Sequence, residues 1–403
     1  MKGNVTNLKT PDLMTLVIEL KEPAPDMPRI VGPTYGGVEI MPKKYFEAVG
    51  ADVFARKPVG SGPYKLVSHD PGVKIVYEAQ KSHPFRPTPA FSRLVLLNIP
   101  EESTRVAMLQ RGDAHMTQIA PDRASEIRGD LEIREIPGAY QVGIAFWMPW
   151  ADLNAPLANT TVRLALAHAV DDNAILKGLY GGRGSASLGW GLFAANSAVD
   201  PKRPSMQPFK YDPNLARELL TKAGFEKGLE VKLYSIANDG IAPELPKLAT
   251  IVADYWTKVG VKVTMVGIGM TEFRALYRGA AAAKNIGNTA SVFRLPAILD
   301  IDFLCANAQG YWRSDGTSPL VKNPEVDRLC SEAMSAVDEA TRAGKFQQLY
   351  DVLRKEVGGG FAIADTPSLW AVNKRVVGKW QPIVNYGIGL GAIYETVEPA
   401  SKR

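Results

Sequence analysis

One stretch of the chain limits the possible folds more than any other: a strand, a helix and a second strand between residues 230 and 266. Glu230–Ile236 and Val261–Val266 are rich in β-branched and other apolar side chains, as strands are. Between them, Pro243–Val259 carries apolar side chains at helical spacing, among them Leu248 and Val252. A helix that connects two such strands makes them parallel neighbours in one sheet. The pattern therefore predicts an α/β domain.

Residues that cap helix ends mark further helices. Asp212 and Pro213 open a helix that stops before Gly224, because a carboxylate accepts bonds from the first turn and proline fits the first helical position. A hydroxyl cap is expected to open a helix at Thr160, and Asp171 to cap the next one. Spacing and turn residues predict further helices over Ser103–Arg111, Glu325–Val337 and Glu339–Glu356, strands over Leu13–Leu20, Lys74–Ala79 and Val95–Ile99, and short strand-like pieces over Phe361–Val377.

Length and composition describe a large globular protein. From typical domain sizes, a chain of 403 residues is expected to fold into two or three domains. Its 46% hydrophobic and 22% charged residues exclude a disordered or coiled-coil protein. The net charge of +5 is spread without a basic run and gives no reason to expect a nucleic-acid partner. No apolar stretch is long enough to span a membrane, and the first residues lack the apolar core of a signal peptide.

The two cysteines, Cys305 and Cys330, are too far apart for a CxxC motif. This spacing excludes a zinc knuckle and a thioredoxin-type dithiol, and it leaves open whether the two form a disulfide. So few cysteines suit a cytosolic or bacterial periplasmic protein better than a small secreted scaffold.

Searches for catalytic and metal-binding motifs give no candidate. The glycine runs that contain serine lack the GxSxG spacing of a serine hydrolase. No Gly-Lys pair completes a phosphate-binding loop. The alternating glycines near residue 389 are not followed by a predicted helix, as a dinucleotide-binding motif requires. The four histidines are too widely spaced for a helical or hairpin metal pair. His168, between two alanines on an apolar helix, is interpreted as structural. We therefore predict no catalytic residue, no metal and no cofactor.

Several aromatic side chains fall outside the helical stripes, in positions predicted as turns or strand ends. Aromatic residues with polar neighbours in such positions are typical of a binding cleft. We predict five ligand-binding residues, which combine flat apolar faces with one positive charge: Tyr140, Trp190, Phe293, Arg294 and Trp312. The alternative is that Phe293 belongs to the core and that Arg294 is a solvated surface charge.

Four segments, in this order, resemble the family 5 extracytoplasmic solute-binding proteins. They are PVGSGPYKLV (Pro58–Val67), the helical stretch Ala158–Gly184, YDPNLARELLTKAG (Tyr211–Gly224) and VGVKVTMV (Val259–Val266). This group contains the dipeptide-, oligopeptide- and nickel-binding proteins that serve ABC importers. The resemblance extends over nearly the whole chain, from about Val5 to the C-terminus.

The resemblance implies an α/β fold of the type II periplasmic-binding-protein kind, with two main lobes around a ligand cleft and a hinge. It makes residues 1–57 a remnant of the small inserted domain II and residues 58–143 part of domain I. Residues 144–365 become the α/β domain III, and residues 366–403 the return to domain I. Family members carry a signal peptide, opening strands and most of domain II upstream. The expectation is therefore an N-terminally truncated chain that lacks part of the first lobe.

The function implied by the resemblance is that of a receptor rather than an enzyme. Such a receptor lies in the periplasm and captures a peptide-like or other small solute, which it delivers to the permease subunits of an ABC transporter. It has no nucleic-acid partner and is expected to be a monomer when full length. Two alternatives stay open: a hydrolase or transferase with converged catalytic residues, and an inert truncated fragment.

One departure from the family pattern concerns the ligand. Peptide-binding members place an aspartate shortly after a domain III strand to hold the amino group of the peptide. The matching stretch, Ser291–Leu304, has Pro296 at about that place, while Arg294 favours an anionic or carboxylated solute. Asp300 and Asp302 correspond better to an acidic-proline-acidic segment of the family at its domain junction.

Overall fold

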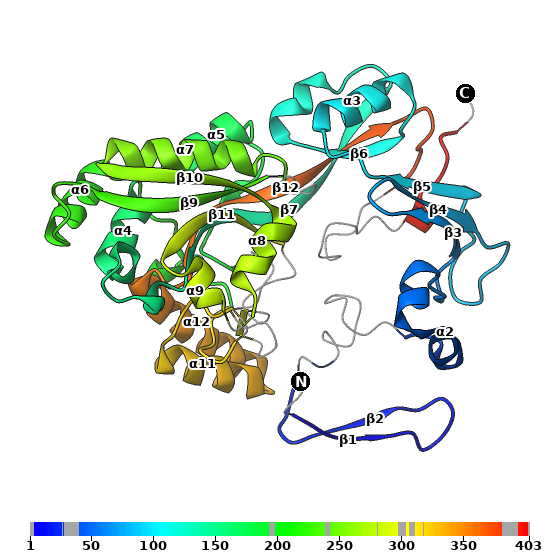
Figure 1. Ribbon diagram of the computed structural model, residues 1–403, viewed down its shortest axis with the longest axis horizontal. Helices are drawn as coiled ribbons and strands as arrows, with labels where there is room; N and C mark the ends of the chain where they lie inside the picture. The colour runs from blue at the N-terminus through cyan, green and yellow to red at the C-terminus, as the bar shows by residue number, and fades with distance from the viewer. Residues whose placement is uncertain are drawn as a thin grey trace. The chain divides into compact units, whose positions relative to one another are not determined.

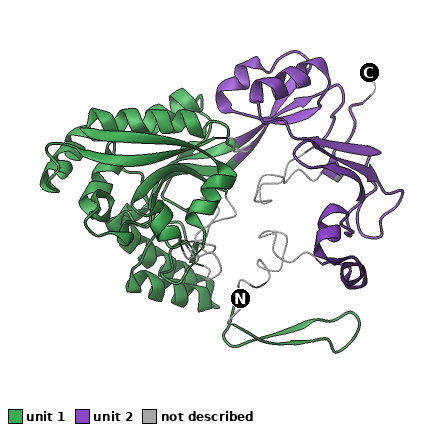
Figure 2. Ribbon diagram, in the orientation of Figure 1, with its two compact units in different colours: residues 1–29, 138–367 green, residues 30–137, 368–403 purple. Residues whose placement is uncertain are grey.

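The computed structural model describes residues 4–25, 27, 40–192, 198–237, 242–279, 281–296, 304–305, 311–316, 318–380 and 394–401. The chain divides into two compact units (Figure 2). Unit 1 comprises residues 1–29 and 138–367, and unit 2 comprises residues 30–137 and 368–403. The chain passes from one unit to the other within two long strands, β7 (Leu131–Trp147) and β12 (Gly360–Asn373). The family-domain limits given above remain predictions.

Unit 1 is built on a mixed sheet in the order β10 (Val261–Gly269), β9 (Leu229–Ala237), β11 (Thr289–Pro296), β7 and β12, with the short β8 (Ser185–Ala186) paired to β12 (Figure 1). β9 and β10 are parallel, with Val261 opposite Leu229, and α7 (Leu245–Lys258) connects them. The apolar stripe of α7 is fully buried against the sheet, which confirms the predicted strand-helix-strand unit.

Other helices of unit 1 begin largely where the sequence signals place them. Asp171 accepts a bond from the Ala174 amide, and Asp212 accepts one from the Leu215 amide, as predicted. The hydroxyl cap expected near Thr160 is wrong, because the amide oxygen of Asn159 accepts the bond from the Thr161 amide instead. These helices are α4 (Thr160–His168), α5 (Asp172–Leu179), α6 (Pro213–Lys222), α8 (Met270–Tyr277), α9 (Ala282–Ile286), α11 (Pro324–Ser335) and α12 (Glu339–Glu356).

Two strands are longer than the sequence analysis predicts. β12 is a single strand of 14 residues, so the prediction of short pieces over Phe361–Val377 is wrong. β7 has 17 residues, and it includes aromatic positions that we expected in turns. Both strands are buried on both faces over most of their unit 1 portions, which removes the alternation of polar and apolar residues that identifies a strand in sequence.

Unit 2 contains an antiparallel sheet of β3 (Tyr64–Asp70), β4 (Lys74–Ala79) and β5 (Arg93–Leu97). Its β6 (Met116–Ile119) pairs with the Leu369–Val372 part of β12, and α3 (Glu102–Arg111) ends at Gly112 as predicted. A small core joins α3, β6, β7 and β12, and it consists of Val106, Leu109, Ile119, Leu131, Leu369 and Ala371. α2 (Lys43–Arg56) also belongs to unit 2.

Near the N-terminus, β1 (Val5–Lys9) and β2 (Val17–Leu20) form an antiparallel pair. The strand predicted over Leu13–Leu20 therefore begins later, at Val17. The carboxylate of Asp12 accepts a bond from the Met14 amide, and such a side-chain turn competes with extended structure. Five 3₁₀ turns complete the described elements: Pro121–Glu126, Pro149–Ala151, Pro156–Ala158, Pro204–Met206 and Tyr394–Thr396.

Cys305 and Cys330 are joined by a disulfide, with their Cα atoms 5.2 Å apart. This resolves the pairing that their spacing left open. Cys330 lies on α11, so the bond attaches the short segment around Cys305 to that helix. Both cysteines are buried in the core of unit 1.

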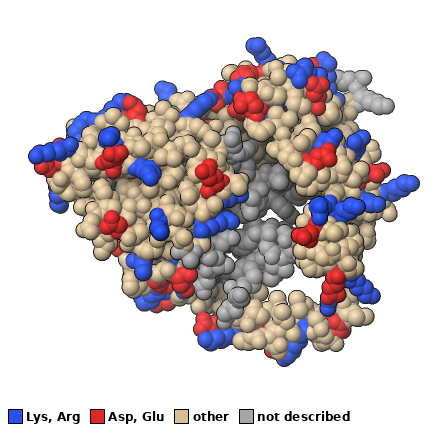
Figure 3. Space-filling model, in the orientation of Figure 1, with Lys and Arg blue, Asp and Glu red and all other residues tan. Residues whose placement is uncertain are grey.

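The surface of unit 1 shown in Figure 3 carries basic and acidic side chains interspersed rather than in blocks. Several of them form exposed ion pairs, such as those of Arg328 with Glu325 and Glu332 on α11. Exposed pairs of this kind contribute little to stability. In the part of the chain that the structure describes, no helix is both long and apolar enough to cross a membrane.

Candidate functional site

Polar side chains meet at one edge of the unit 1 sheet, where β7 begins its unit 1 portion and where β11 and the unit 1 portion of β12 end. The antiparallel register of β7 and β11 sets Arg294 opposite Val142 and Pro296 opposite Tyr140. The guanidinium carbon of Arg294 consequently lies 5.2 Å from the centroid of the Tyr140 ring, a cation–π contact. Arg294 is only 5% exposed, whereas Tyr140 is half-buried. The sheet thus holds one cation in a fixed place against an aromatic ring.

Gln141, the next residue on β7, is completely buried and connects three elements. Its amide nitrogen, which has two hydrogens, shares them among three acceptors: Ser187 Oγ (2.7 Å), Asp365 Oδ1 (3.0 Å) and the Leu192 carbonyl (3.2 Å). Its amide oxygen accepts from the Gly191 backbone N–H at 2.6 Å. Gln141 therefore fixes the backbone of residues 191–192 to the sheet.

Asp365 is the carboxylate of this network and lies on β12. Burial raises its pKa to about 6, although the hydrogen bonds from Gln141 and Ser187 act in the opposite direction. The sequence analysis missed both Gln141 and Asp365. Each is a polar residue inside an otherwise apolar run of the sequence, and this pattern could have identified them. Polar residues in such runs are buried and make hydrogen bonds to other buried groups.

Residues Ser187–Leu192, which we call the Trp190 loop, depend on two glycines. Gly189 (φ +149°) and Gly191 (φ +78°) adopt backbone angles that other residues rarely take. A Cβ atom on Gly189 would lie 2.3 Å from the Tyr350 hydroxyl, which donates a hydrogen bond of 2.9 Å to the Trp190 carbonyl. Tyr350 and Gln141 therefore hold the loop from two sides.

The Trp190 ring packs across β7 at Gly143. A Cβ atom on Gly143 would lie 2.8 Å from Trp190 Cζ3, so only glycine leaves room for the indole. Phe293 is the cross-strand partner of Gly143, and its ring centroid lies 6.2 Å from that of Trp190. Because neighbouring residues of a strand point to opposite faces, Phe293 and Arg294 lie on different faces of the sheet.

The five predicted ligand-binding residues therefore form two groups. Tyr140 and Arg294 contact each other on one face, and Trp190 and Phe293 contact each other on the opposite face. Trp312 is 1% exposed and packs beside Tyr350 with ring centroids 6.1 Å apart. The expectation of loop or strand-end positions is wrong for Tyr140, Phe293 and Arg294, which lie inside β7 and β11. Both strands are buried there, so the alternation of polar and apolar residues that marks a strand in sequence is missing. Whether these residues bind a ligand remains a prediction.

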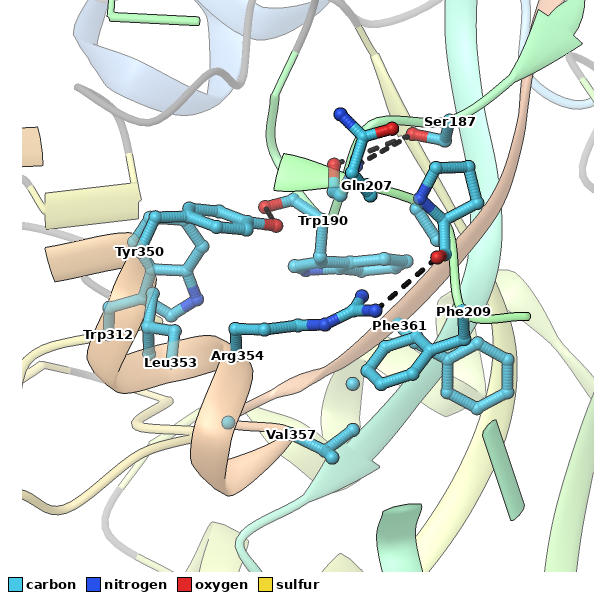
Figure 4. A pocket seen from close by; sticks show the side chains of 15 residues that line it. Ser187, Trp190, Gln207, Phe209, Trp312, Tyr350, Leu353, Arg354, Val357 and Phe361 are labelled. Carbon is cyan, nitrogen blue, oxygen red and sulfur yellow. Dashed lines mark hydrogen bonds between the residues drawn. The ribbon is translucent and has the colours of Figure 1, made fainter. Parts of the chain in front are cut away.

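A narrow cavity lies beneath the Trp190 loop, and we call it the Arg354 cavity (Figure 4). Its walls include Trp190, Phe209, Trp312, Tyr350 and Arg354. The space open to the centre of a water molecule is about 20 Å³. A single water needs about 10 to 15 Å³ of such space, so the cavity has room for one or two waters and not for a peptide.

Within the described ranges, no three histidine, cysteine or acidic side chains are grouped to hold a metal ion. His168 has its Nδ1 atom 2.7 Å from the Lys210 carbonyl oxygen, as expected of a structural histidine. Asp300 and Asp302 lie outside the described residues.

Comparison with known proteins identifies the family. Residues 2–309 match the pattern of the bacterial extracellular solute-binding proteins, family 5 Middle, which is more than half of the chain. The chain belongs to this family. The resemblance noted in the sequence is thereby confirmed, and members of the family are extracytoplasmic binding proteins.

Among its relatives is heme-binding protein A of Haemophilus influenzae, 28% identical over 74% of this chain and 53% of the relative. The dipeptide-binding protein of Escherichia coli is 27% identical over 60% of this chain and 45% of its own length. The alignments with this family 5 chain thus span about half the length of these two relatives. Both are named as binding proteins rather than enzymes.

Solved structures show the same fold. The dipeptide-binding protein from Pseudoalteromonas sp. SM9913, in complex with Met-Leu, matches 99% of this chain and 76% of its own with a TM-score of 0.82 at 20% identity. AppA from Bacillus subtilis, in complex with a nonapeptide, matches 98% of this chain and 78% of its own with a TM-score of 0.81 at 18% identity. The predicted α/β fold of the type II periplasmic-binding-protein kind is confirmed.

Proposed function

We propose that this chain is the substrate-binding receptor of an ABC-type importer and that it binds a small solute bearing a carboxylate, such as a peptide. The observation that carries the proposal is the Arg294–Tyr140 pair at the sheet edge, where a fixed guanidinium offers a planar set of donors that matches a carboxylate. Family membership and the peptide-binding relatives support the same conclusion.

In this proposal Tyr140 and Arg294 contact the solute. Trp190 and Phe293 lie on the opposite face of the sheet, and Trp312 packs beside Tyr350, so in this proposal these three rings support the strands and the Trp190 loop from behind the sheet. The chain performs no catalysis and uses no cofactor. It passes the solute to permease subunits in the membrane and, in its full-length form, acts as a monomer.

The proposed location is the periplasm. The family is extracytoplasmic, and the Cys305–Cys330 disulfide suits an oxidising compartment.

Arg294→Ala is expected to weaken binding of a dipeptide by about 10- to 100-fold, because a charge-assisted hydrogen bond to the carboxylate is lost. Isothermal titration calorimetry with Met-Leu and with Met-Leu amide measures this. The amide should bind the wild-type chain about as weakly as Met-Leu binds Arg294→Ala, since both changes remove the same contact.

Arg328→Ala is the matched control. Arg328 is an exposed arginine on α11, paired with Glu325 and Glu332, and its removal should leave the affinity unchanged. Equal affinity of wild type and Arg294→Ala for Met-Leu would remove Arg294 from the site. Failure of the wild-type chain to bind either form of the dipeptide would argue against a peptide as the solute.

A further inference from the structure

The Arg354 cavity is lined by aromatic rings and by hydrogen-bond donors, and its chemistry differs from that of the sheet edge. It lies wholly within unit 1, between the end of α12, the start of β12, residues 207–209 and the Trp190 loop (Figure 4). None of the contacts described for Tyr140 or Arg294 involves it. The cavity is therefore a second candidate binding site, distinct from the Arg294–Tyr140 pair.

Arg354 brings a partly buried positive charge to this cavity. Its guanidinium carbon lies 3.3 Å from the centroid of the Phe209 ring. Among the described residues it donates one hydrogen bond, to the Pro208 carbonyl at 3.3 Å, although a guanidinium has five N–H donors. Burial lowers the pKa of Arg354 to about 10, so the side chain still carries its charge at neutral pH.

Asp172 and Tyr350 face Arg354, and neither forms an ion pair or hydrogen bond with it in the described part of the chain. Asp172 on α5 is 6% exposed, and its Oδ1 atom has no hydrogen-bond partner in the described ranges. Burial raises the pKa of Asp172 well above its ordinary value, which favours the neutral acid. Tyr350, on α12 itself, has its pKa raised by burial and is neutral. A cation that is partly withdrawn from water and has no ion-paired anion is costly.

Trp312 supplies a second donor. The residue is 1% exposed, and its indole Nε1 is a buried N–H with no acceptor among the described residues. Trp312 and Arg354 both line the cavity, with the Arg354 guanidinium directed toward Phe209 (Figure 4). Native proteins rarely leave a buried donor without an acceptor, so an unsatisfied group of this kind indicates a bound species. The Tyr350 hydroxyl, by contrast, is already bonded to the Trp190 carbonyl.

We propose that the Arg354 cavity binds one small monovalent inorganic anion, such as chloride, with Arg354 as its counter-charge and the Trp312 indole N–H as a hydrogen-bond donor. The room available fits this class of ligand, because chloride is only slightly larger than water and the cavity holds one or two waters. Bound there, the anion stabilises unit 1 beneath the Trp190 loop.

Urea unfolding of the full chain tests the proposal, with chloride exchanged for gluconate at constant ionic strength. Gluconate is too large for the cavity. Raising the chloride concentration from zero to about 0.2 M should increase the folding equilibrium constant by about tenfold. A ligand that binds only the folded state has this effect when its concentration is roughly ten times its Kd. Arg354→Met should abolish this dependence, and Trp312→Phe, which removes only the N–H and part of the ring, should weaken it.

Arg328→Met serves as the matched control, because it removes an exposed, ion-paired arginine and should keep the full dependence on chloride. A direct measurement covers the case in which Arg354→Met fails to fold: crystals of the wild-type chain grown in bromide should give an anomalous peak in the cavity. Identical urea curves in chloride and gluconate, with no bromide peak, would mean that the cavity holds water only and would overturn the proposal.

Discussion

Gln141→Met is expected to lower the free energy of unfolding by about 4 kcal/mol, since methionine fills the space but makes none of the hydrogen bonds of the amide. The Gly191 N–H and the Leu192 carbonyl would lose a partner inside the protein, and Asp365 would keep only its bond with Ser187. Each buried polar group left without a partner costs about 1 to 3 kcal/mol. Urea denaturation followed by tryptophan fluorescence measures the loss.

Gln80→Met is the control for this substitution. Gln80 is an exposed glutamine in unit 2 whose amide donates one bond of 2.7 Å to the Gly62 carbonyl. Its replacement should cost no more than about 1 kcal/mol. If the two variants unfold at the same urea concentration as the wild type, Gln141 does not fix the Trp190 loop in the way that its hydrogen bonds indicate.

Asp365→Asn is expected to stabilise the protein relative to wild type in a pH-dependent way. The pKa of Asp365 is about 6 when folded, above its ordinary value of 3.8, so the folded state binds the proton more tightly. Below pH 3.8 the carboxyl is protonated in both states and contributes no penalty. As the pH rises from 3.8 to 6, the carboxyl ionises in the unfolded chain but stays largely protonated in the folded one, so the wild type loses up to about 3 kcal/mol. The asparagine variant does not titrate and does not undergo this loss.

The measurement is the difference in unfolding free energy between Asp365→Asn and wild type at pH 4 and at pH 7. The difference should grow in favour of the variant by about 2 kcal/mol over this range, because part of the penalty is already present at pH 4. Asp351→Asn should change in the opposite sense, because the hydrogen bond from Arg203 lowers the pKa of Asp351. A difference for Asp365→Asn that is constant with pH would mean that Asp365 titrates normally and is not buried as described.

Local signals in the sequence predicted the elements whose ends and faces are set by neighbouring residues. Asp212, Pro213 and Gly224 delimited α6, because capping depends on side chains within the first and last turns. The stripe on α7 predicted burial on one face, and the strands on either side of it could only be parallel. Four segments with moderate individual specificity, in a fixed order, were enough to indicate the family.

The sheet edge and the Arg354 cavity could not be predicted in the same way. Gln141, Ser187 and Asp365 are far apart in the chain and meet only because β7 and β12 are neighbours in the sheet. Arg294 was singled out by its charge, but its contact with Tyr140 follows from the register of β7 and β11. Strand register is set by pairing over long sequence separations, and no local pattern reports it.

By itself, then, the sequence determined that this chain is an α/β protein of family 5, with capped helices, parallel β9 and β10, and no recognisable catalytic motif. The tertiary structure alone decided which side chains share a site. It separated Phe293 from Arg294 onto opposite faces, buried a carboxylate beside Gln141, and left Arg354 and the Trp312 N–H facing a small cavity. The physical reason is that helix ends and amphipathic faces depend on residues a few positions apart, whereas burial and desolvation depend on every element that packs around a residue.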